Sequence, residues 1–420
     1  MTNILDELQW RGLVAQTTDL DALRAALDEG PVTLYCGFDP TAASLHFGNL
    51  VQLIVLRHFQ RAGHRVLALV GGSTGLIGDP RPTSERALKT RELTAEYVER
   101  IRQQVAPFLD LDGDNPALLV NNLDWTAPMS ALDFLRDVGK HFRVNQMIKK
   151  DAIAARLESQ EGISYTEFSY QLLQGMDFLH LYREYGCSLQ TGGQDQWGNL
   201  TAGVDLIHRA EGGTAHVLTT PLVTDEAGEK YGKSAGNAVW LAADMTSPYA
   251  FYQYWINVAD SETGKLLRIF TDRSQEEIAE LELAAVERPH LREAQRALAA
   301  EVTTLVHGAA ATEQVEAASG VLFGRGDPAT IDARTLADAT RELPGAHVTP
   351  GTDVLQALVE TGLADSRGAA RRLVVEGGVS INNVKVNDVE RTLDAADFLH
   401  GAVALLRRGR RNLAAARNAG

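Results

Sequence analysis

The sequence predicts an α/β protein that begins with a doubly wound parallel sheet and continues with a helical region and a small α+β unit. Strand-like and helix-like apolar segments alternate through the first half of the chain, which is the pattern of a parallel sheet covered by helices. Strand signals vanish after Ser247. A stretch rich in proline and glycine, from Leu343 to Thr352, then separates the last part of the chain.

Strand, helix and strand follow one another at the start of the predicted sheet. Val32–Cys36 is a short apolar run typical of a buried strand. Gly48–Ala62 carries apolar residues at helical spacing, and His64–Val70 is the next strand. The strand pattern recurs at Ala117–Asn121 and Cys187–Gln190. In such a sheet, ligands bind at the carboxyl ends of the strands.

The later part of the chain is predicted to be mainly helical. Glu276–Val286 and Leu291–His307 are rich in Ala, Leu and Glu, which favour helices. Gly377–Val386 predicts a strand pair beside two short helices. We therefore expect five segments: a sheet domain at 1–225, a mobile glycine-rich loop and linker at 226–247, a helical domain at 248–330, a linker at 331–350 and a compact unit at 351–420.

Composition describes an ordinary globular protein of several domains. The 420 residues exceed what one core usually holds, 45% are hydrophobic and 23% are charged. We see no secretory signal and no apolar run of the roughly 18 residues that a membrane span needs. The two cysteines, Cys36 and Cys187, are too few for a disulfide framework or a four-cysteine zinc site, which suits the cytoplasm.

Charge is distributed unevenly along the chain. The net charge of −15 argues against indiscriminate binding of nucleic acid. The last twenty residues nevertheless carry five arginines and no acidic residue: Arg407, Arg408, Arg410, Arg411 and Arg417. We expect this tail to be the place where an RNA backbone is accepted.

The segment His46-Phe47-Gly48-Asn49 is the first chemical signature. It follows the first predicted strand and opens a helix, where unpaired N–H groups and the helix dipole favour anions. Gly48 would let a flat base approach the backbone closely. The alternative is a helix start that happens to contain a histidine.

The second signature is Lys230-Tyr231-Gly232-Lys233-Ser234, within a glycine-rich loop. Two mobile ammonium groups can stabilise the charge that develops on a departing pyrophosphate. The alternative is an ordinary surface loop. Neither a GxxxxGK[ST] loop nor a GxGxxG motif occurs, which disfavours kinases and dehydrogenases.

A polar stripe marks the predicted helix Tyr165–Tyr185. Tyr170, Gln174 and Asp177 are spaced so that they share one face of an otherwise apolar helix. Such a stripe needs partners or a ligand, since burying it unpaired is costly. A structural hydrogen-bond network is the alternative. The following run, Thr191–Asn199, links a strand to a helix and carries a carboxylate and carboxamides suited to ribose and carbonyl oxygens.

These motifs together resemble the bacterial tyrosyl-tRNA synthetase family of class I aminoacyl-tRNA synthetases. The matching motifs are YCGFDPTA, HFGN, LVGGSTGLIGDP, TEFSYQLLQGMDF, GGQDQWGN and KYGKS, in the family's order along nearly the whole chain. The resemblance implies a Rossmann-like catalytic domain, a helical domain in the tRNA anticodon region, and an S4-like RNA-binding domain at 351–420.

The resemblance implies a role for each matching residue. Tyr35 and Asp177 would bracket the phenol hydroxyl of tyrosine. The ammonium group would be held by Asp79, Tyr170 and Gln174, and the carboxylate end by Gln196. The remaining residues would bind ATP: Gly37, Asp39, Thr41, His46, Gly48, Asn49, Gly193, Asp195, Arg86, Lys230 and Lys233. Of these, His46, Lys230 and Lys233 would be catalytic.

Three departures from the family pattern stand out. Tyr231 and Ser234 replace other residues of the lysine loop but leave both lysines in place. Asn49 occupies the place of a second histidine, and its side chain can still donate a hydrogen bond. The segment from Pro80 to Glu85 is shorter and stiffer than the lysine-rich segment of some relatives, so a phosphate contact from Arg81 is not carried over.

The resemblance implies a two-step reaction with ATP, L-tyrosine and tRNA(Tyr) as substrates, in a cytoplasmic homodimer that contacts no membrane. Mg²⁺ would accompany ATP, without a dedicated metal site or a tightly bound cofactor. Three alternatives remain: a tryptophanyl-tRNA synthetase, another adenylyl-transferring enzyme with an HxGH-type site, and a non-catalytic RNA-binding relative. The Tyr35 and Asp177 pair disfavours the first, and the intact site residues disfavour the last.

Overall fold

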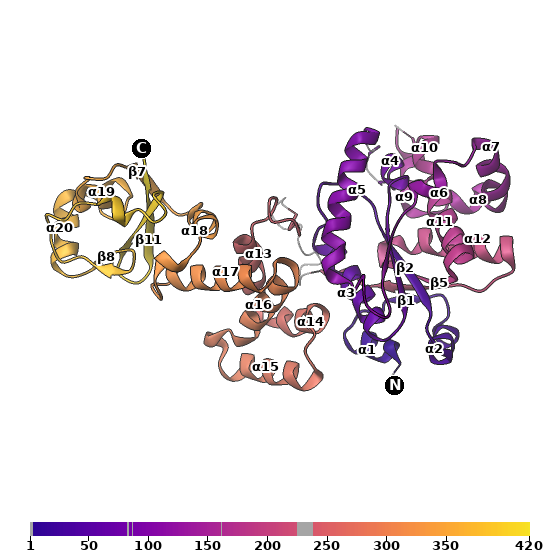
Figure 1. Ribbon diagram of the computed structural model, residues 1–420, viewed down its shortest axis with the longest axis horizontal. Coiled ribbons are helices and arrows are strands. Elements are labelled where there is room, and N and C mark those ends of the chain that lie inside the picture. The colour runs from indigo at the N-terminus through magenta and orange to yellow at the C-terminus, as the bar shows by residue number, and fades with distance from the viewer. Residues whose placement is uncertain (1–2, 82–83, 86, 161, 225–237) are drawn as a thin grey trace. The chain divides into compact units, whose positions relative to one another are not determined.

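The computed structural model describes residues 3–81, 84–85, 87–160, 162–224 and 238–420. The chain forms two compact units, one of Met1–Met245 with Ala259–Ala294, the other of Thr246–Val258 with Gln295–Gly420 (Figure 1). Within the described ranges, no helix is long and apolar enough to cross a membrane.

A mainly parallel sheet forms the centre of the first unit. In the part of the chain that the structure describes, its order is β1-β6-β5-β2-β3-β4, and only β1 runs antiparallel to its neighbour. The strands are β1 (Gln16–Thr17), β2 (Thr33–Phe38), β3 (Arg65–Val70), β4 (Leu118–Asn121), β5 (Cys187–Gly193) and β6 (His216–Thr220). The doubly wound α/β prediction is confirmed, although β1 and β6 were not predicted.

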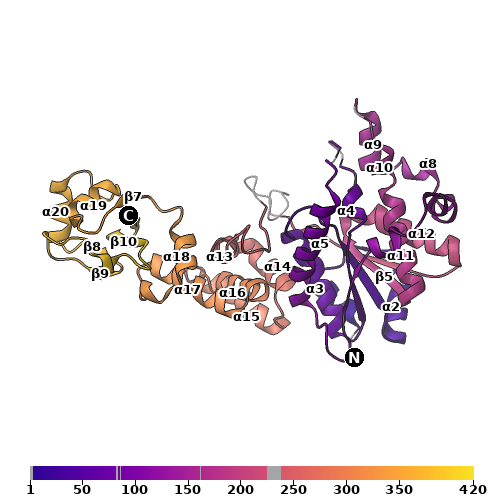
Figure 2. The ribbon, with the colours of Figure 1, turned by 45° about the horizontal axis from the view of Figure 1, so that its top comes forward.

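Helices cover both faces of this sheet. Figures 1 and 2 show α3 (Phe47–Arg61) and α5 (Arg91–Val105) on one face, and α11 (Tyr170–Tyr185) and α12 (Trp197–Glu211) on the other. The chain builds β2, β3 and β4 outward, then returns to place β5 beside β2. The strand order therefore reverses between β2 and β5, where sheets of this kind bind ligands.

Shorter elements complete the first unit. They are α1 (Ile4–Trp10), α2 (Leu20–Glu29), α4 (Thr74–Ile77), α6 (Leu123–Thr126), α7 (Ala131–Asp133), a π-helical turn (Phe134–Val138), α8 (Val144–Met147), α9 (Asp151–Glu158) and α10 (Tyr165–Phe168). The helix predicted at Tyr165–Tyr185 is thus two helices, α10 and α11, separated at Ser169.

The predicted helical domain at 248–330 is divided between the two units. α13 (Pro248–Ile256) belongs to the second unit, whereas α14 (Asp260–Phe270) and α15 (Gln275–Glu287) belong to the first. The buried Arg11 explains the attachment of α14, since its guanidinium donates to the carbonyl oxygens of Arg268 and Thr271, both over 2.8 Å. Local sequence patterns carry no sign of such a distant bond.

The second unit combines helices with a small sheet. Its helices, besides α13, are α16 (Glu293–His307), α17 (Ala309–Leu322), α18 (Ala333–Thr340), α19 (Val354–Glu360) and α20 (Arg367–Val375). Its strands lie in the order β7-β11-β10-β8-β9 and are β7 (Gly345–Val348), β8 (Val379–Ile381), β9 (Val384–Lys385), β10 (Val403–Arg408) and β11 (Asn412–Asn418).

Residues 331–350, predicted as a linker, contain α18 and β7 and belong to this packed unit. Leu405 packs in a core with α17 and α18, whereas its neighbour Leu406 packs in the core formed with α19 and α20. At Gly345 a Cβ atom would lie 2.1 Å from the carbonyl oxygen of Ala415, so the glycine permits strand pairing. The linker prediction is therefore wrong.

The basic tail is not a free segment, because it forms the hairpin of β10 and β11. Arg407 is buried and donates to the carbonyl oxygens of Val321 and Leu322, each over 3.0 Å. Arg408 and Arg417 also donate to main-chain carbonyls. Three of the five tail arginines thus stabilise the fold, and the exposed Arg410 and Arg411 remain open to solvent.

Candidate active site

A cavity of about 380 Å³ opens where β2 and β5 end. Every predicted site residue that the structure describes lines it: Tyr35, Gly37, Asp39, Thr41, His46, Gly48, Asn49, Asp79, Tyr170, Gln174, Asp177, Gly193, Asp195 and Gln196. Arg86, Lys230 and Lys233 lie outside the described residues. Segments distant in sequence therefore meet in one site.

His46 and Asn49 form a capping box at the start of α3. The Nδ1 atom of His46 accepts a hydrogen bond from the Gly48 N–H over 3.0 Å, and Asn49 Oδ1 accepts from the His46 N–H over 3.1 Å. Since Nδ1 is an acceptor, the neutral ring carries its proton on Nε2. A Cβ at position 48 would lie 2.9 Å from His46 Cε1, so glycine is needed for this fold-back.

The segment after the predicted lysine loop is fixed to the first signature. His46 and Trp240 form an antiparallel β-bridge, and the Phe47 N–H donates to the Val239 carbonyl over 3.0 Å. The Leu241 N–H donates to the Leu45 carbonyl over 2.9 Å. Residues 239–241, which follow the lysine-loop signature in the sequence, thus pair with residues 45–47, where the HFGN signature begins.

The polar stripe of α11 faces the cavity. Asp177 is buried, and its two oxygens accept hydrogen bonds from Asn122 Nδ2 and Trp125 Nε1, each over 2.9 Å. Burial raises the pKa of Asp177 to about 7, although these two donors oppose the rise. Each of the two donors binds one carboxylate oxygen, which fixes the orientation of the Asp177 side chain. The remaining lone pairs of these oxygens can accept a hydrogen bond from a hydroxyl group.

Four buried polar atoms in the cavity wall have no hydrogen-bond partner among the described residues. They are Tyr35 Oη, Gln174 Oε1, Gln190 Oε1 and Thr191 Oγ1. Tyr35 is 1% exposed, and burial, followed by the charge of Asp177, raises its pKa well above the usual value, so the hydroxyl keeps its proton. Buried polar atoms of this kind are normally paired, which indicates that a polar ligand completes them.

Asp39 connects two sides of the cavity. Its Oδ1 accepts from Thr74 Oγ1 over 2.6 Å and its Oδ2 from Tyr170 Oη over 2.8 Å. The Tyr170 hydroxyl, predicted to hold an ammonium group, therefore donates to Asp39 and can offer only its lone pairs to a cation.

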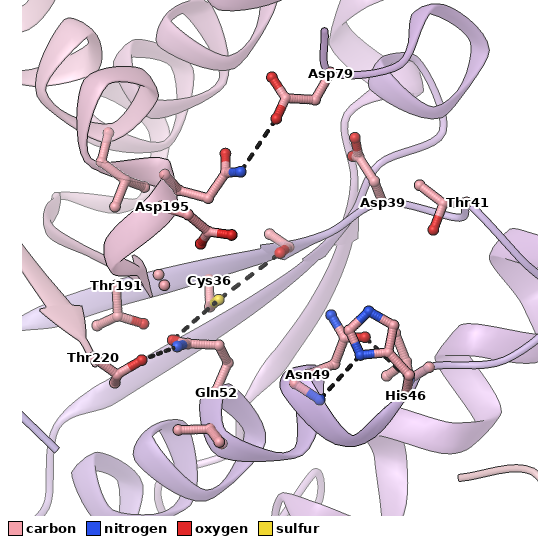
Figure 3. A pocket seen from close by; sticks show the side chains of 18 of the residues that line it. Cys36, Asp39, Thr41, His46, Asn49, Gln52, Asp79, Thr191, Asp195 and Thr220 are labelled. Atoms are coloured by element: carbon pink, nitrogen blue, oxygen red, sulfur yellow. Dashed lines mark hydrogen bonds between the residues drawn. The ribbon is translucent and has the colours of Figure 1, made fainter. Parts of the chain in front are cut away.

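The Thr191–Asn199 run supplies the opposite wall. Gln196 Nε2 donates to Asp79 Oδ2 over 3.1 Å, and Asn199 Nδ2 donates to Asp79 Oδ1 over 3.0 Å. Figure 3 shows Asp39, Asp79 and Asp195 around the upper part of the pocket and His46 with Asn49 below them. One part of the site is thus rich in carboxylates, and the other presents a helix start.

The electrostatics of the cavity favour a cation at one end. Four carboxylates line it, and none of its described lining residues is a lysine or arginine. No three His, Cys, Asp or Glu side chains gather as metal ligands in the described ranges. Among the described lining residues, no side chain supplies the positive charge that would attract a polyphosphate.

Asn122, Trp125, Gln190 and Asn199 contribute to the site but were not singled out from the sequence. Asn122 and Trp125 directly follow the predicted strand that became β4, so the rule for carboxyl ends of strands could have found them. Gln190 lies within β5, where its side chain gave no separate signal.

Comparison with known proteins now decides the family. Residues 27–324 match the family model of class I tRNA synthetases (W and Y), and residues 335–415 match the SYY-like C-terminal domain of tyrosine–tRNA ligase. A tyrosine–tRNA ligase of Streptomyces griseus is 61% identical over 416 residues, covering 99% of this chain and 98% of the relative. The chain belongs to the tyrosine–tRNA ligase family. The Nocardia farcinica ligase is 57% identical over 98% of both chains.

Solved structures of this family share the fold of the chain. A C-terminally truncated mitochondrial tyrosyl-tRNA synthetase of Coccidioides posadasii aligns with a TM-score of 0.67 and 33% identity, over 75% of this chain and 91% of that one. A tryptophanyl-tRNA synthetase of Encephalitozoon cuniculi aligns with a TM-score of 0.54 and 14% identity, over 74% and 87%, which shows a common fold only.

Proposed function

We propose that this tyrosine–tRNA ligase family member activates L-tyrosine with ATP and then transfers the tyrosyl group to the 3′-terminal adenosine of tRNA(Tyr). The observation that carries the proposal is the meeting of Tyr35 and Asp177 at one end of the cavity that the HFGN helix start also lines. One end suits a phenol, and the other suits a nucleotide.

The tyrosine hydroxyl binds between Tyr35 and Asp177 in this proposal. Tyr35 Oη is a buried donor that lacks a partner among the described residues, and Asp177 accepts through lone pairs that Asn122 and Trp125 leave available. Phenylalanine would leave both groups unpaired, which is the physical basis for rejecting it. Tyrosyl-tRNA synthetases are themselves the established example of such discrimination, so its magnitude is not a prediction of ours.

The charged end of tyrosine binds near the carboxylates. Asp79 attracts the ammonium group, and the unpartnered Gln174 Oε1 accepts one of its protons. Tyr170 contributes lone pairs, and Gln196 lies where a carboxylate would be held.

ATP occupies the remainder of the cavity. His46, Gly48 and Asn49 lie against the nucleotide, and Gly193 with Asp195 addresses the ribose hydroxyls. Gly37, Asp39 and Thr41 border the phosphates. The cations that grip pyrophosphate would be Lys230, Lys233 and Arg86, which lie outside the described residues. Mg²⁺ would arrive with ATP, since the described side chains form no dedicated metal site.

In the first step, the tyrosine carboxylate oxygen attacks the α-phosphorus, the bond to the bridging oxygen breaks, and pyrophosphate leaves with that electron pair. In the second step, the ribose hydroxyl of the terminal adenosine attacks the tyrosyl carbonyl, loses its proton and releases AMP. No side chain becomes covalently modified. Positioning and charge stabilisation supply the catalysis, with the His46 Nε2–H as a fixed donor to the nucleotide.

The second unit is proposed to bind tRNA, in a homodimer located in the cytoplasm. Exposed Arg367, Arg371 and Arg372 lie on α20 and would meet a phosphate backbone, for which Arg367 and Arg371 would exchange their surface ion pairs with Asp353 and Glu390. The arginines that hold main-chain carbonyls in β10 and β11 are excluded from this role by their contacts.

Pyrophosphate exchange into ATP tests the proposal, measured with each standard amino acid in turn. We expect exchange with tyrosine alone, and strong loss of exchange in Lys233→Ala. Exchange that does not depend on tyrosine would refute the substrate assignment, and full activity of the lysine variant would refute the proposed mechanism.

A further inference from the structure

A second hollow, of about 310 Å³, lies behind the wall of the active-site cavity. Lys150, Gly198 and residues of α8 and α12 line it. The stem of Lys150 crosses Gly198, where a Cβ would lie 3.2 Å from Lys150 Cε. The ammonium group then reaches Asn199, with 2.6 Å between Lys150 Nζ and Asn199 Oδ1. Asn199 thus separates Lys150 from the carboxylate of Asp79.

The hydrogen bonds from Lys150 to Asp79 have a fixed direction. An ammonium group only donates, so the Oδ1 atom of Asn199 must face Lys150. Its Nδ2 atom then faces Asp79 Oδ1 at 3.0 Å and Gln196 Oε1 at 2.9 Å. With Oε1 used in this way, Gln196 turns its Nε2 to Asp79 Oδ2, 3.1 Å away. Lys150 at one end and the Asp79 carboxylate at the other therefore require the same orientation of the Asn199 amide, and Lys150 anchors that amide in place.

We propose that Lys150 is a positioning residue for the substrate ammonium site, because it fixes Asn199 and thereby orients Asp79 and Gln196. The inference rests on the proposed function, in which Asp79 binds the ammonium group of tyrosine. Without the ammonium of Lys150, the Asn199 side chain loses its anchor at Oδ1, and its Nδ2 is no longer held against Asp79 Oδ1. The carboxylate would then lose its support and turn away from the substrate.

The charge of Asp79 favours the ammonium form of Lys150. The residue is half-buried, and burial lowers the pKa of its ammonium to about 7, a cost that the charge of Asp79 partly offsets. The neighbouring Lys149 is exposed and lines the same hollow. It therefore provides a matched control in which an adjacent positive charge is removed and the hydrogen bonds to Asp79 remain.

Two fragments of tyrosine distinguish binding at the ammonium site from binding in the rest of the pocket. Tyramine keeps the phenol and the ammonium group, whereas 3-(4-hydroxyphenyl)propionate keeps the phenol and the carboxylate. Dissociation constants are measured by isothermal titration calorimetry on the full-length wild type, Lys150→Met and Lys149→Met. We expect Lys150→Met to raise the dissociation constant of tyramine about tenfold and that of the propionate less than about twofold. Loss of one charge-assisted contact would have an effect of this size. Lys149→Met is expected to bind both fragments like the wild type.

Equal weakening of both fragments, or unchanged tyramine binding, would overturn the inference. If Lys150→Met fails to fold by circular dichroism, Asn199→Leu decides in its place, since it interrupts the same hydrogen bonds and is expected to weaken tyramine selectively. A wild type that binds neither tyrosine nor tyramine would refute the proposed function. A wild type that binds them while the variants do so equally well would refute only the positioning role.

Discussion

Trp125 Nε1 donates a hydrogen bond to Asp177 Oδ1 over 2.9 Å, and the Trp125 ring stacks on His180 at a centroid distance of 4.3 Å. Asp177 and His180 lie one turn apart on α11, so the tryptophan holds the carboxylate and packs on the same helix. This contact joins α6 and α11, two elements that the polar stripe alone did not connect. The orientation of Asp177 therefore depends on a residue outside its own helix.

Trp125→Phe removes the donor and keeps an aromatic ring against His180. We expect the KM for tyrosine in pyrophosphate exchange to rise about tenfold, because Asp177 loses one of two fixed donors, while the KM for ATP stays unchanged. Steady-state kinetics with each substrate varied in turn measure both values. An unchanged KM for tyrosine would show that Asn122 alone orients Asp177.

The pH dependence of stability reports the burial of Asp177. Its pKa is about 7 in the folded protein, against about 3.9 for an unfolded chain. Between these values the unfolded chain releases a proton that the folded chain retains, so Asp177 makes stability fall as pH rises from about 4 to 7. Above that window its effect is constant.

Asp177→Asn removes this titration. Urea unfolding of both proteins from pH 5 to pH 8 is expected to show the variant gaining stability relative to wild type as pH rises to about 7. A stability difference that is independent of pH over this range would contradict a raised pKa.

Arg156 and Glu167 form a buried ion pair, each 1% exposed, with 3.0 Å between Nη1 and Oε2. Glu167→Gln leaves the guanidinium without its counter-charge, and we expect a loss of roughly 3–5 kcal/mol in the free energy of unfolding. Urea unfolding measures it. The exposed pair of Arg136 and Asp137 is the control, and Arg136→Met is expected to leave stability nearly unchanged. Equal effects of the two variants would contradict the role assigned to burial.

Much of the catalytic site could be predicted because its residues follow local rules. HFGN begins a helix after a strand, and Tyr170, Gln174 and Asp177 share a helix face by spacing alone. Asn199 could not be assigned in this way, since its role arises from hydrogen bonds to the distant Lys150 and Asp79.

The second unit was harder to predict for a similar reason. Arg407 looked like a solvent-exposed cation within a basic tail, yet it is buried in β10 and bonded to the end of α17. A charged side chain that satisfies carbonyl groups from another element has the same sequence signature as one that binds RNA. The linker prediction at 331–350 failed because Pro344 and Gly345 mark the start of a strand rather than a domain boundary.

Arg407→Met tests this reassignment. The Val321 and Leu322 carbonyls would lose a donor, so we expect a clear loss of thermal stability in the second unit, with Arg411→Met as the exposed control. Tyrosine-dependent pyrophosphate exchange is measured in parallel and should persist in both variants at low temperature. If Arg411→Met destabilises the protein as much as Arg407→Met, the buried contact is not the cause.

The measurement that tests the central claim most directly is the preference for tyrosine over phenylalanine in pyrophosphate exchange. It is made on the wild type and on Tyr35→Phe. The variant keeps the ring that packs on Phe178 and removes only the hydroxyl. We predict that the wild type catalyses exchange in the presence of tyrosine and not of phenylalanine. We predict that Tyr35→Phe loses about tenfold in kcat/KM for tyrosine, which reduces its preference for tyrosine over phenylalanine. An unchanged preference in Tyr35→Phe would contradict the assignment of this cavity to the phenol of tyrosine.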